Sequence, residues 1–164
     1  MREVSTFVYE GTPDFFSYPF FLARANPEWV AMLKDPARQQ AMGASSAAQR
    51  YKVALQIASR NLKRLVDAGV PIAMGTDTGP TGRFQGYFEL MELELMVKAG
   101  MTPRQALTAA TRDAARCMKL DRDLGTIERG KWADFVVLDA DPLADISNVR
   151  KISSVWIAGN NVAR

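Results

Sequence analysis

The sequence predicts an α/β fold, in which strands and helices alternate along the chain. A run rich in β-branched and aromatic residues, Val4–Tyr9, predicts a first strand. A long amphipathic helical pattern begins at Ser46, ends at Gly69 and leads directly into the apolar run Val70–Met74, which fits a strand covered on both faces. The order strand, helix, strand predicts a βαβ crossover, whose two parallel strands end at the same edge of the sheet.

Length and composition are those of a globular domain. The chain has 164 residues, of which 48% are hydrophobic and 24% charged, and its net charge is +3. The basic residues carry no nucleic-acid-binding motif, and no segment resembles a membrane span or a signal peptide. We therefore expect neither nucleic acid nor a membrane as a partner. The single cysteine, Cys117, excludes an internal disulfide, is expected to be buried, and is compatible with a cytoplasmic setting.

The chain contains no histidine. Imidazole is the commonest metal ligand and a frequent general base, and it is also the base of Ser and Cys triads. A site of any of these kinds would therefore need carboxylates alone or residues from another chain.

The first part of the chain after the predicted strand is rich in aromatic residues and prolines. Asp14–Arg24 carries five Phe and Tyr side chains without clean periodicity, which predicts a long loop folded onto a surface. Such a loop could line a substrate pocket or cover a core, and both alternatives remain open. Asn26 and Asp35 each precede a proline, so short helices are predicted over Pro27–Leu33 and Pro36–Met42.

Three further helical patterns follow. The helix from Ser46 places its apolar residues at spacings of three and four. These residues are Tyr51, Ala54, Leu55, Ala58, Leu62, Leu65 and Val66. A second helix is predicted over Gln85–Lys98, and Thr102–Gln105 forms a capping box that begins a third. Thr111–Asp113 interrupts that third helix and could kink or divide it. Its expected apolar face consists of Leu107, Ala110, Ala114 and Met118.

After Asp123 the sequence changes to short strand-like runs separated by turns. The predicted strands are Leu124–Ile127, Gly130–Ala133, Asp134–Asp139 and Ile152–Ala158. Gly159–Asn161 is a hairpin signal. The chain is therefore expected to divide into residues 1–123 and a small β unit, residues 124–164.

Asp77 is the leading candidate for a functional residue. It lies in Gly75–Gly79, directly after the predicted buried strand Val70–Met74. The carboxyl ends of parallel strands are where α/β sheets and barrels place their chemistry. The alternative is that Asp77 caps the next helix or closes a turn, and for an Asp taken alone this is the commoner role.

Four segments in order resemble the C-terminal part of the amidohydrolase superfamily, most closely its imidazolonepropionase and prolidase-like, metal-dependent group. They are Gly75–Gly79, Met96–Pro103, Ala109–Thr111 and Gly130–Asp139. The resemblance covers nearly the whole chain from Val4 onward. It implies the C-terminal portion of a (β/α)₈ TIM-type barrel, about two βα units, plus a small β-sandwich segment. By this similarity Val4–Tyr9 is barrel strand seven and Val70–Met74 is strand eight.

The resemblance also implies a function, namely metal-dependent hydrolysis of a C–N bond in a small amide, a dipeptide or a cyclic amide. Asp77 matches the last metal-ligand position of the family, so it would ligate a divalent metal, zinc by preference, and shuttle a proton. Tyr9, Thr76, Thr78 and Arg83 are weaker candidates for substrate contacts at the same edge. The histidines and the carboxylated Lys or Glu of the family have no counterpart here, and Leu90 stands where relatives are expected to have a histidine. We therefore expect neither tight metal binding nor appreciable hydrolase activity from this chain alone.

Two barrel strands cannot close a barrel, which needs about 250 residues. Either another polypeptide supplies the N-terminal part of the barrel, or copies of the chain associate through strand edges and the Phe-rich segment. The start at Met1, just before a predicted strand, suggests a truncated frame or a fragment. The alternative function is a non-catalytic remnant or a self-associating structural module, in which Asp77 has only a structural role.

Overall fold

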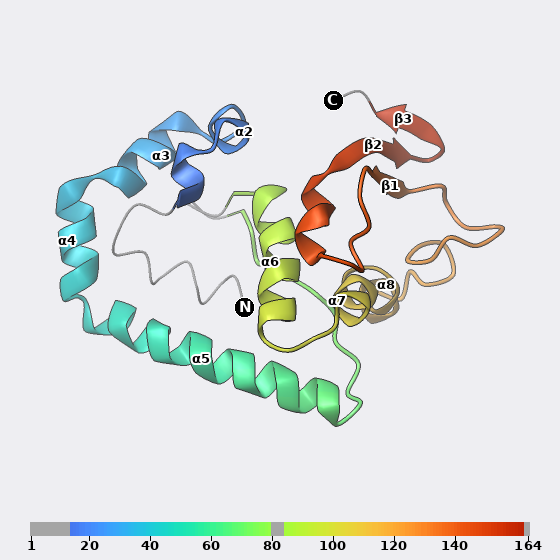
Figure 1. The fold of residues 1–164 in the computed structure, drawn as a ribbon, viewed down its shortest axis with the longest axis horizontal. Helices are drawn as coiled ribbons and strands as arrows, with labels where there is room; N and C mark the ends of the chain where they lie inside the picture. Colours follow the sequence, from blue (N-terminus) through green and yellow to red (C-terminus); the bar gives the residue numbers. More distant parts are fainter. Residues whose placement is uncertain (1–13, 80–83, 163–164) are drawn as a thin grey trace. The chain divides into compact units, whose positions relative to one another are not determined.

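The computed structural model describes residues 14–79 and 84–162 (Figure 1). The predicted strand Val4–Tyr9 lies outside the described residues. The chain divides into two compact units, one formed by the described residues up to Asn61 together with Thr76–Met91, the other by Leu62–Gly75 and the chain from Glu92 onward. The boundary between residues 123 and 124 that the sequence suggested stays a prediction.

Four short helical elements open the described chain. They are the 3₁₀ helix η1 (Asp14–Ser17), α2 (Pro19–Leu22), α3 (Pro27–Lys34) and α4 (Pro36–Ala44). The prolines begin α3 and α4 as predicted, and the side chain of Asn26 accepts a hydrogen bond from the backbone N–H of Glu28 at 2.9 Å. The prediction of a loop over Asp14–Arg24 was wrong in part, because η1 and α2 form there.

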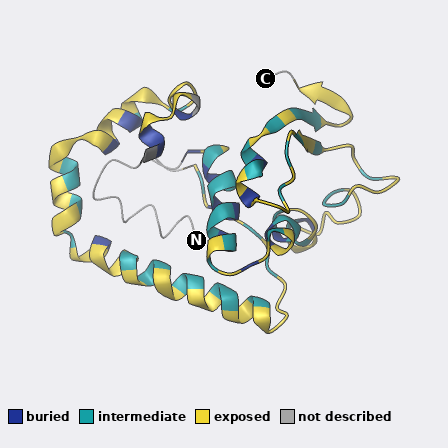
Figure 2. Cartoon of the chain, viewed as in Figure 1, coloured by how far each residue is buried: buried dark blue, intermediate teal, exposed yellow. Residues whose placement is uncertain are grey.

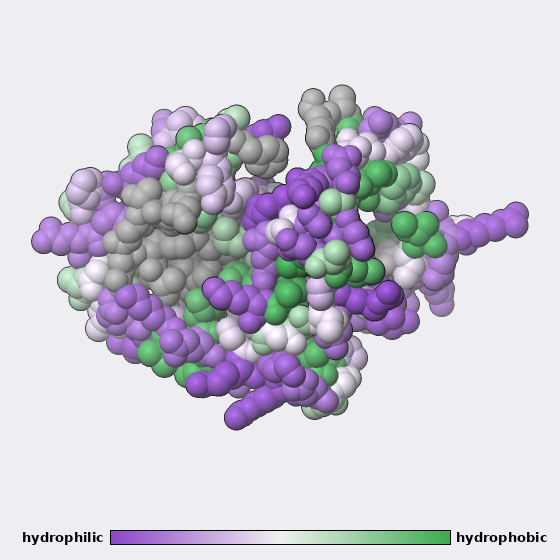
Figure 3. Space-filling view, in the orientation of Figure 1, coloured by the Kyte–Doolittle hydropathy of each residue, from purple (hydrophilic) through white to green (hydrophobic). Residues whose placement is uncertain are grey.

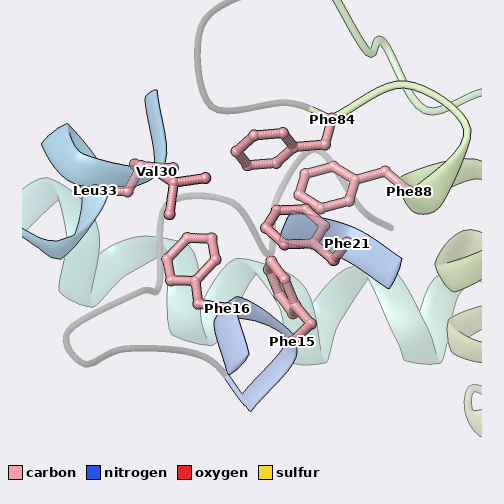
Figure 4. Packing of buried hydrophobic residues seen from close by; sticks show 7 residues of the cluster. All are labelled: Phe15, Phe16, Phe21, Val30, Leu33, Phe84 and Phe88. Atoms are coloured by element: carbon pink, nitrogen blue, oxygen red, sulfur yellow. The ribbon is translucent and has the colours of Figure 1, made fainter. Parts of the chain in front are cut away.

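The aromatic side chains of this region form the hydrophobic core of the first unit (Figure 4). Its buried members are Phe15, Phe16, Phe21, Val30, Leu33, Phe84 and Phe88. The rings meet edge to face, with centroids 4.9 Å apart for Phe15 and Phe16 and 4.6 Å apart for Phe21 and Phe84. Of the two roles considered for this segment, the structure supports the covering of a core.

The long helix α5 (Ser46–Asp67) forms as predicted and ends in a left-handed turn at Gly69. The backbone N–H of Gly69 donates to the carbonyl of Val66, and that of Val70 donates to the carbonyl of Leu65, both at 3.0 Å. Together these bonds form a Schellman motif, which satisfies the last carbonyls of the helix. Along α5 only Ala48 is buried (Figure 2), and apolar side chains reach the surface between hydrophilic ones (Figure 3).

The structure assigns no strand to Val70–Met74 within the described residues, and the strand expected beside it, Val4–Tyr9, lies outside them, so the predicted pairing stays a prediction. Ile72 and Met74 are half-buried, whereas Val70, Pro71 and Ala73 are exposed. One described backbone hydrogen bond anchors this segment, from the N–H of Met74 to the carbonyl of Ala109 at 3.0 Å. A strand requires a neighbour that pairs with its backbone groups, and the apolar sequence alone does not supply one.

The helices of the second half are α6 (Tyr87–Lys98), α7 (Pro103–Ala110) and α8 (Arg112–Cys117). The predicted capping box at the start of α7 is present: Thr102 Oγ1 accepts from the N–H of Gln105 at 3.2 Å, and Gln105 Oε1 accepts from the N–H of Thr102 at 2.8 Å. The backbone of Thr111, with φ −122° and ψ −89°, separates α7 from α8.

The packing face of α7 and α8 differs from the predicted one. The buried residues are Ala106, Ala109 and Ala115, whereas Met118 is 69% exposed. Cys117 is also exposed, so the prediction of a buried thiol was wrong. The break at Thr111 changes the direction of the helix face beyond it, which accounts for the exposure of Cys117 and Met118.

A small antiparallel sheet ends the chain. Its strands are β1 (Phe135–Leu138), β2 (Ile152–Ile157) and β3 (Asn160–Val162), in the order β1-β2-β3 (Figure 1). A short 3₁₀ helix, η2 (Ile146–Arg150), lies between β1 and β2 in the sequence. Phe135 pairs with Trp156 across the strands, and their rings stack with centroids 5.6 Å apart. The predicted hairpin is confirmed, although its turn is at Ala158 and Gly159, with φ values of 49° and 78°.

The two other strands predicted for the tail, Leu124–Ile127 and Gly130–Ala133, are turns and irregular backbone. Lys131 organises this segment, because its Nζ donates to the carbonyl of Asp121 at 2.8 Å and to Oγ1 of Thr126 at 2.6 Å. The half-buried ammonium group of Lys131 is thus the hydrogen-bond donor for both of these oxygens. Among the described residues no helix is long and apolar enough to cross a membrane.

Candidate functional site

Asp77 follows the segment Val70–Met74 in the sequence and has an unusual backbone conformation. Its side chain is exposed, and its backbone is left-handed, with φ 53°. Few residues other than glycine adopt this conformation, and Asp is one that tolerates it. Gly79 follows with φ 139°. The Asp77 carboxyl group is therefore open to solvent, in a loop whose backbone is left-handed at this residue.

The two threonines beside Asp77 converge on one carboxylate. Oγ1 of Thr76 donates to Oε1 of Glu89 at 2.9 Å, and Oγ1 of Thr78 donates to the same oxygen. Thr76 is buried, with 7% of its surface exposed. The two hydroxyl oxygens lie 3.0 Å apart. Since each hydroxyl has a single proton, a hydroxyl that donates to Glu89 does not at the same time donate to the neighbouring hydroxyl.

Glu89 is ionised at neutral pH and lies in the first turn of α6. Partial burial of its carboxyl group raises its pKa, but the hydrogen bonds from Thr78 and Thr76 outweigh this effect, and backbone N–H groups of Glu89 and Gly86 add to them. The net result is a pKa below the usual range for glutamate. The positive end of the helix also favours a negative charge at this position.

The site residues predicted from the sequence have different outcomes. Thr76 and Thr78 are brought together around Glu89 and flank Asp77, while Tyr9 and Arg83 lie outside the described residues. Sequence reasoning missed Glu89, which is 11 residues from Thr78 and 13 from Thr76. No spacing rule connects a loop threonine to a helix glutamate at that separation, so the sequence held no signal for it.

The donor groups of the described residues do not fit a metal site on their own. Within residues 14–79 and 84–162, no group of three or more His, Cys, Asp or Glu side chains could hold a metal ion. The chain has no histidine at all. Transition-metal sites in proteins generally need at least three protein ligands. Asp77 could therefore supply one ligand to a site whose other ligands come from elsewhere.

The chain is similar to known proteins in sequence and in structure. Residues 34–162 match the sequence profile of the amidohydrolase family. An imidazolonepropionase of Deinococcus deserti is 36% identical over 104 residues, which are 61% of this chain and 26% of that protein. The chain thus spans about a quarter of the length of the curated relatives that it matches.

Solved structures agree with this assignment. The structure of a molinate hydrolase has a TM-score of 0.58 and 35% identity, and the match covers 62% of this chain and 25% of that one. The structure of a Xaa-Pro dipeptidase has a TM-score of 0.62 and 24% identity, and the match covers 99% of this chain and 34% of that one. The second match concerns the fold alone. The fold of the chain is thus similar to parts of these two solved structures, and this agrees with the match to the amidohydrolase profile.

Proposed function

This chain belongs to the amidohydrolase family. We propose that it forms part of an enzyme that hydrolyses a C–N bond in a small amide or peptide-like substrate. The observation that carries the proposal is the position of Asp77. It lies within the matched range, after the apolar segment Val70–Met74, with a left-handed backbone and an exposed side chain. A carboxylate there is accessible to substrate and water.

We assign Asp77 the role of proton shuttle. Its carboxylate accepts a proton from a water molecule as the water oxygen bonds to the carbonyl carbon of the substrate. The same carboxyl group then gives that proton to the leaving nitrogen as the C–N bond breaks. The products are a carboxylic acid and an amine, so atoms and charges balance, and Asp77 returns to its ionised form.

A divalent metal, with zinc the expected ion, would supply Lewis-acid activation of the water in the complete enzyme. Asp77 is the one ligand that we assign to this chain. The described residues do not complete a metal site, so the remaining ligands belong to the proposed complementing part. Thr76 and Thr78, together with Tyr9 and Arg83 from outside the described residues, remain candidates for substrate contacts.

The architecture that we propose is the last two βα units of a (β/α)₈ barrel, with the sheet β1-β2-β3 as part of a small β-sandwich. The segment Val70–Met74 would pair as a barrel strand once a neighbouring strand is present. Apolar residues exposed on α5, such as Val53 at 55% and Leu65 at 45%, support a partner surface that covers them. The partner would be the N-terminal part of the barrel or a second copy, in a cytoplasmic setting.

A non-catalytic, self-associating module is the second candidate. The absence of a three-ligand cluster from the described residues favours it for the chain in isolation. The Phe-rich segment is a poor contact for such association, because Phe15, Phe16 and Phe21 are buried within their own unit. Light scattering distinguishes the cases: a stable monomer at micromolar concentration would exclude self-association.

A hybrid enzyme tests the catalytic proposal. The corresponding quarter of the Deinococcus deserti imidazolonepropionase is replaced by this chain, and hydrolysis of cyclic amides, dipeptides and N-acyl amino acids is measured. We expect activity that falls at least about 100-fold in Asp77→Asn, because a general acid-base group contributes roughly that much. Asp67→Asn, a change in the exposed pair with Lys63, is the matched control. A folded hybrid without activity, or with equal loss in both variants, would refute the proposal.

The isolated chain provides a second measurement. We expect purified chain to hold no stoichiometric zinc and to hydrolyse none of these substrates. Zinc bound one to one and lost in Asp77→Asn would show instead that the chain forms a metal site by itself, and would place the whole active site within it.

A further inference from the structure

We propose that Glu89 is a positioning residue that holds the Asp77 loop, residues 75–79, in the conformation that presents the Asp77 carboxylate. The inference rests on the proposed function of Asp77, and it adds a residue that the sequence patterns did not indicate. Glu89 acts through Thr76 and Thr78, which stand on either side of Asp77, and requires no contact with substrate.

The geometry supports a clamp on both sides of one residue. Thr76 and Thr78 are two residues apart, and both hydroxyls donate to Oε1 of Glu89. In an extended strand, side chains two residues apart lie on one face, about 7 Å from each other. Here the hydroxyl oxygens are 3.0 Å apart, and the residue between them, Asp77, has a left-handed backbone. The shared acceptor therefore joins the two residues that flank this unusual conformation.

Charge makes Glu89 suited to this role. Hydrogen bonds to an ionised acceptor are shorter and stronger than those between neutral groups. Glu89 lies in the first turn of α6, which begins at Tyr87. The preceding residue in the same turn, Phe88, is fully buried. The acceptor is thus fixed to a helix whose own first turn contributes to the aromatic core. A loop attached to such a helix keeps its shape without help from bound substrate.

The left-handed conformation of Asp77 explains why a clamp is needed. For residues other than glycine this conformation is less favourable than the right-handed one, although Asp tolerates it better than most. An exposed loop would relax to a negative φ unless other interactions opposed it. Two hydrogen bonds to a charged group provide stabilisation that opposes this relaxation. The hydrogen bonds to Glu89 thus stabilise the left-handed conformation of Asp77, which the backbone alone does not favour.

The test reads the loop directly by NMR on the isotopically labelled chain. In the wild type we expect a strong intraresidue contact between HN and Hα of Asp77, which marks a positive φ, and hydroxyl proton signals from Thr76 and Thr78. Glu89→Leu should abolish all three signals. Glu89→Gln, which keeps one carbonyl oxygen as acceptor, should retain them in weaker form. Glu94→Leu, on the same helix, is the matched control and should leave them unchanged.

Two outcomes overturn the inference. If Glu89→Leu lowers the melting temperature as Glu94→Leu does but leaves the Asp77 signals intact, Glu89 has a stabilising role only. If the wild type lacks the strong Asp77 signal, no clamp exists. Should Glu89→Leu fail to fold, the double variant Thr76→Val and Thr78→Val removes the same two hydrogen bonds with little change in volume. It should lose the Asp77 signal, and retention would refute the proposal.

The hybrid enzyme separates this inference from the function on which it rests. We expect Glu89→Gln to lower kcat about tenfold with KM unchanged, and Glu89→Leu to lower it further. An inactive hybrid with intact loop signals would refute the function of Asp77 and leave the clamp standing. An active hybrid whose kcat is insensitive to Glu89 would refute the positioning role alone.

Discussion

Arg150 of η2 and Glu94 of α6 form a two-pronged ion pair, with Nε to Oε1 at 2.7 Å and Nη2 to Oε2 at 3.1 Å. Both side chains are less than one third exposed, and the residues are 56 positions apart in the sequence. The pair therefore joins the segment before β2 to the helix that follows the Asp77 loop. Paired hydrogen bonds of this geometry need the planar guanidinium group and are not reproduced by lysine.

Replacement of Arg150 tests the contribution of this pair. We expect Arg150→Lys to lower the free energy of unfolding by about 1–2 kcal/mol, because one of two charge-assisted hydrogen bonds is lost from a partly buried site. Urea unfolding measures it. Arg112→Lys is the control, since Arg112 makes a similar contact with Asp113 while 47% exposed, and should change little. Equal effects of the two changes would contradict the prediction.

Truncation of Phe88 tests the aromatic core. Phe88 is fully buried among the rings of Phe15 and Phe84. We expect Phe88→Ala to destabilise the chain by about 3–5 kcal/mol, because it removes apolar contacts and leaves a cavity. The near-ultraviolet circular dichroism should weaken with it. Tyr18→Ala, at a side chain 47% exposed, is the matched control. A small loss in Phe88→Ala would mean that the cluster is loosely packed.

Replacement of Lys131 tests the hydrogen bonds that its ammonium group makes within residues 121–131. In Lys131→Met the aliphatic stem is kept, but the carbonyl of Asp121 and the hydroxyl of Thr126 lose their donor. We expect faster proteolytic cleavage within residues 121–131 and a stability loss of about 1–3 kcal/mol. Mass spectrometry of the fragments locates the cuts. Cleavage first at a site outside this segment would contradict a local role for Lys131.

The pKa of Glu89 predicts a dependence of stability on pH. Because folding lowers this pKa, the ionised form stabilises the folded state fully above the ordinary value of 4.5, and the contribution disappears as pH falls through the lower pKa of the folded state. The difference in melting temperature between wild type and Glu89→Gln should therefore shrink on acidification. Glu128→Gln, at a side chain 63% exposed, should show no such trend. A constant difference down to low pH would exclude ionised Glu89 as its source.

Local signals explain which parts of the fold were predictable. The prolines that begin α3 and α4, the Schellman turn at Gly69 and the capping box at Thr102 each depend on residues within one turn of each other. Such motifs are specified by adjacent residues and were predicted correctly.

The remaining features depend on distant residues. The pairing predicted for Val70–Met74 depends on a neighbouring strand, Val4–Tyr9, which lies outside the described residues. The pairing of Thr76 with Glu89 and the contact of Phe16 with Phe84 likewise join separate parts of the chain. The apolar run before Asp77 and the resemblance to the amidohydrolase superfamily made Asp77 a candidate, but the hydrogen bonds around it join residues far apart in the sequence.

The turn between β2 and β3 has a consequence for misassembly. Two-residue hairpin turns with both φ values positive favour Asn-Gly, and here Ala158 takes the first position at φ 49°. Alanine is disfavoured there by about 1–2 kcal/mol. The three-residue strand β3 has little pairing to offset this cost. It should therefore detach before the rest of the sheet, uncovering an edge of β2 on which a strand from another molecule could be added.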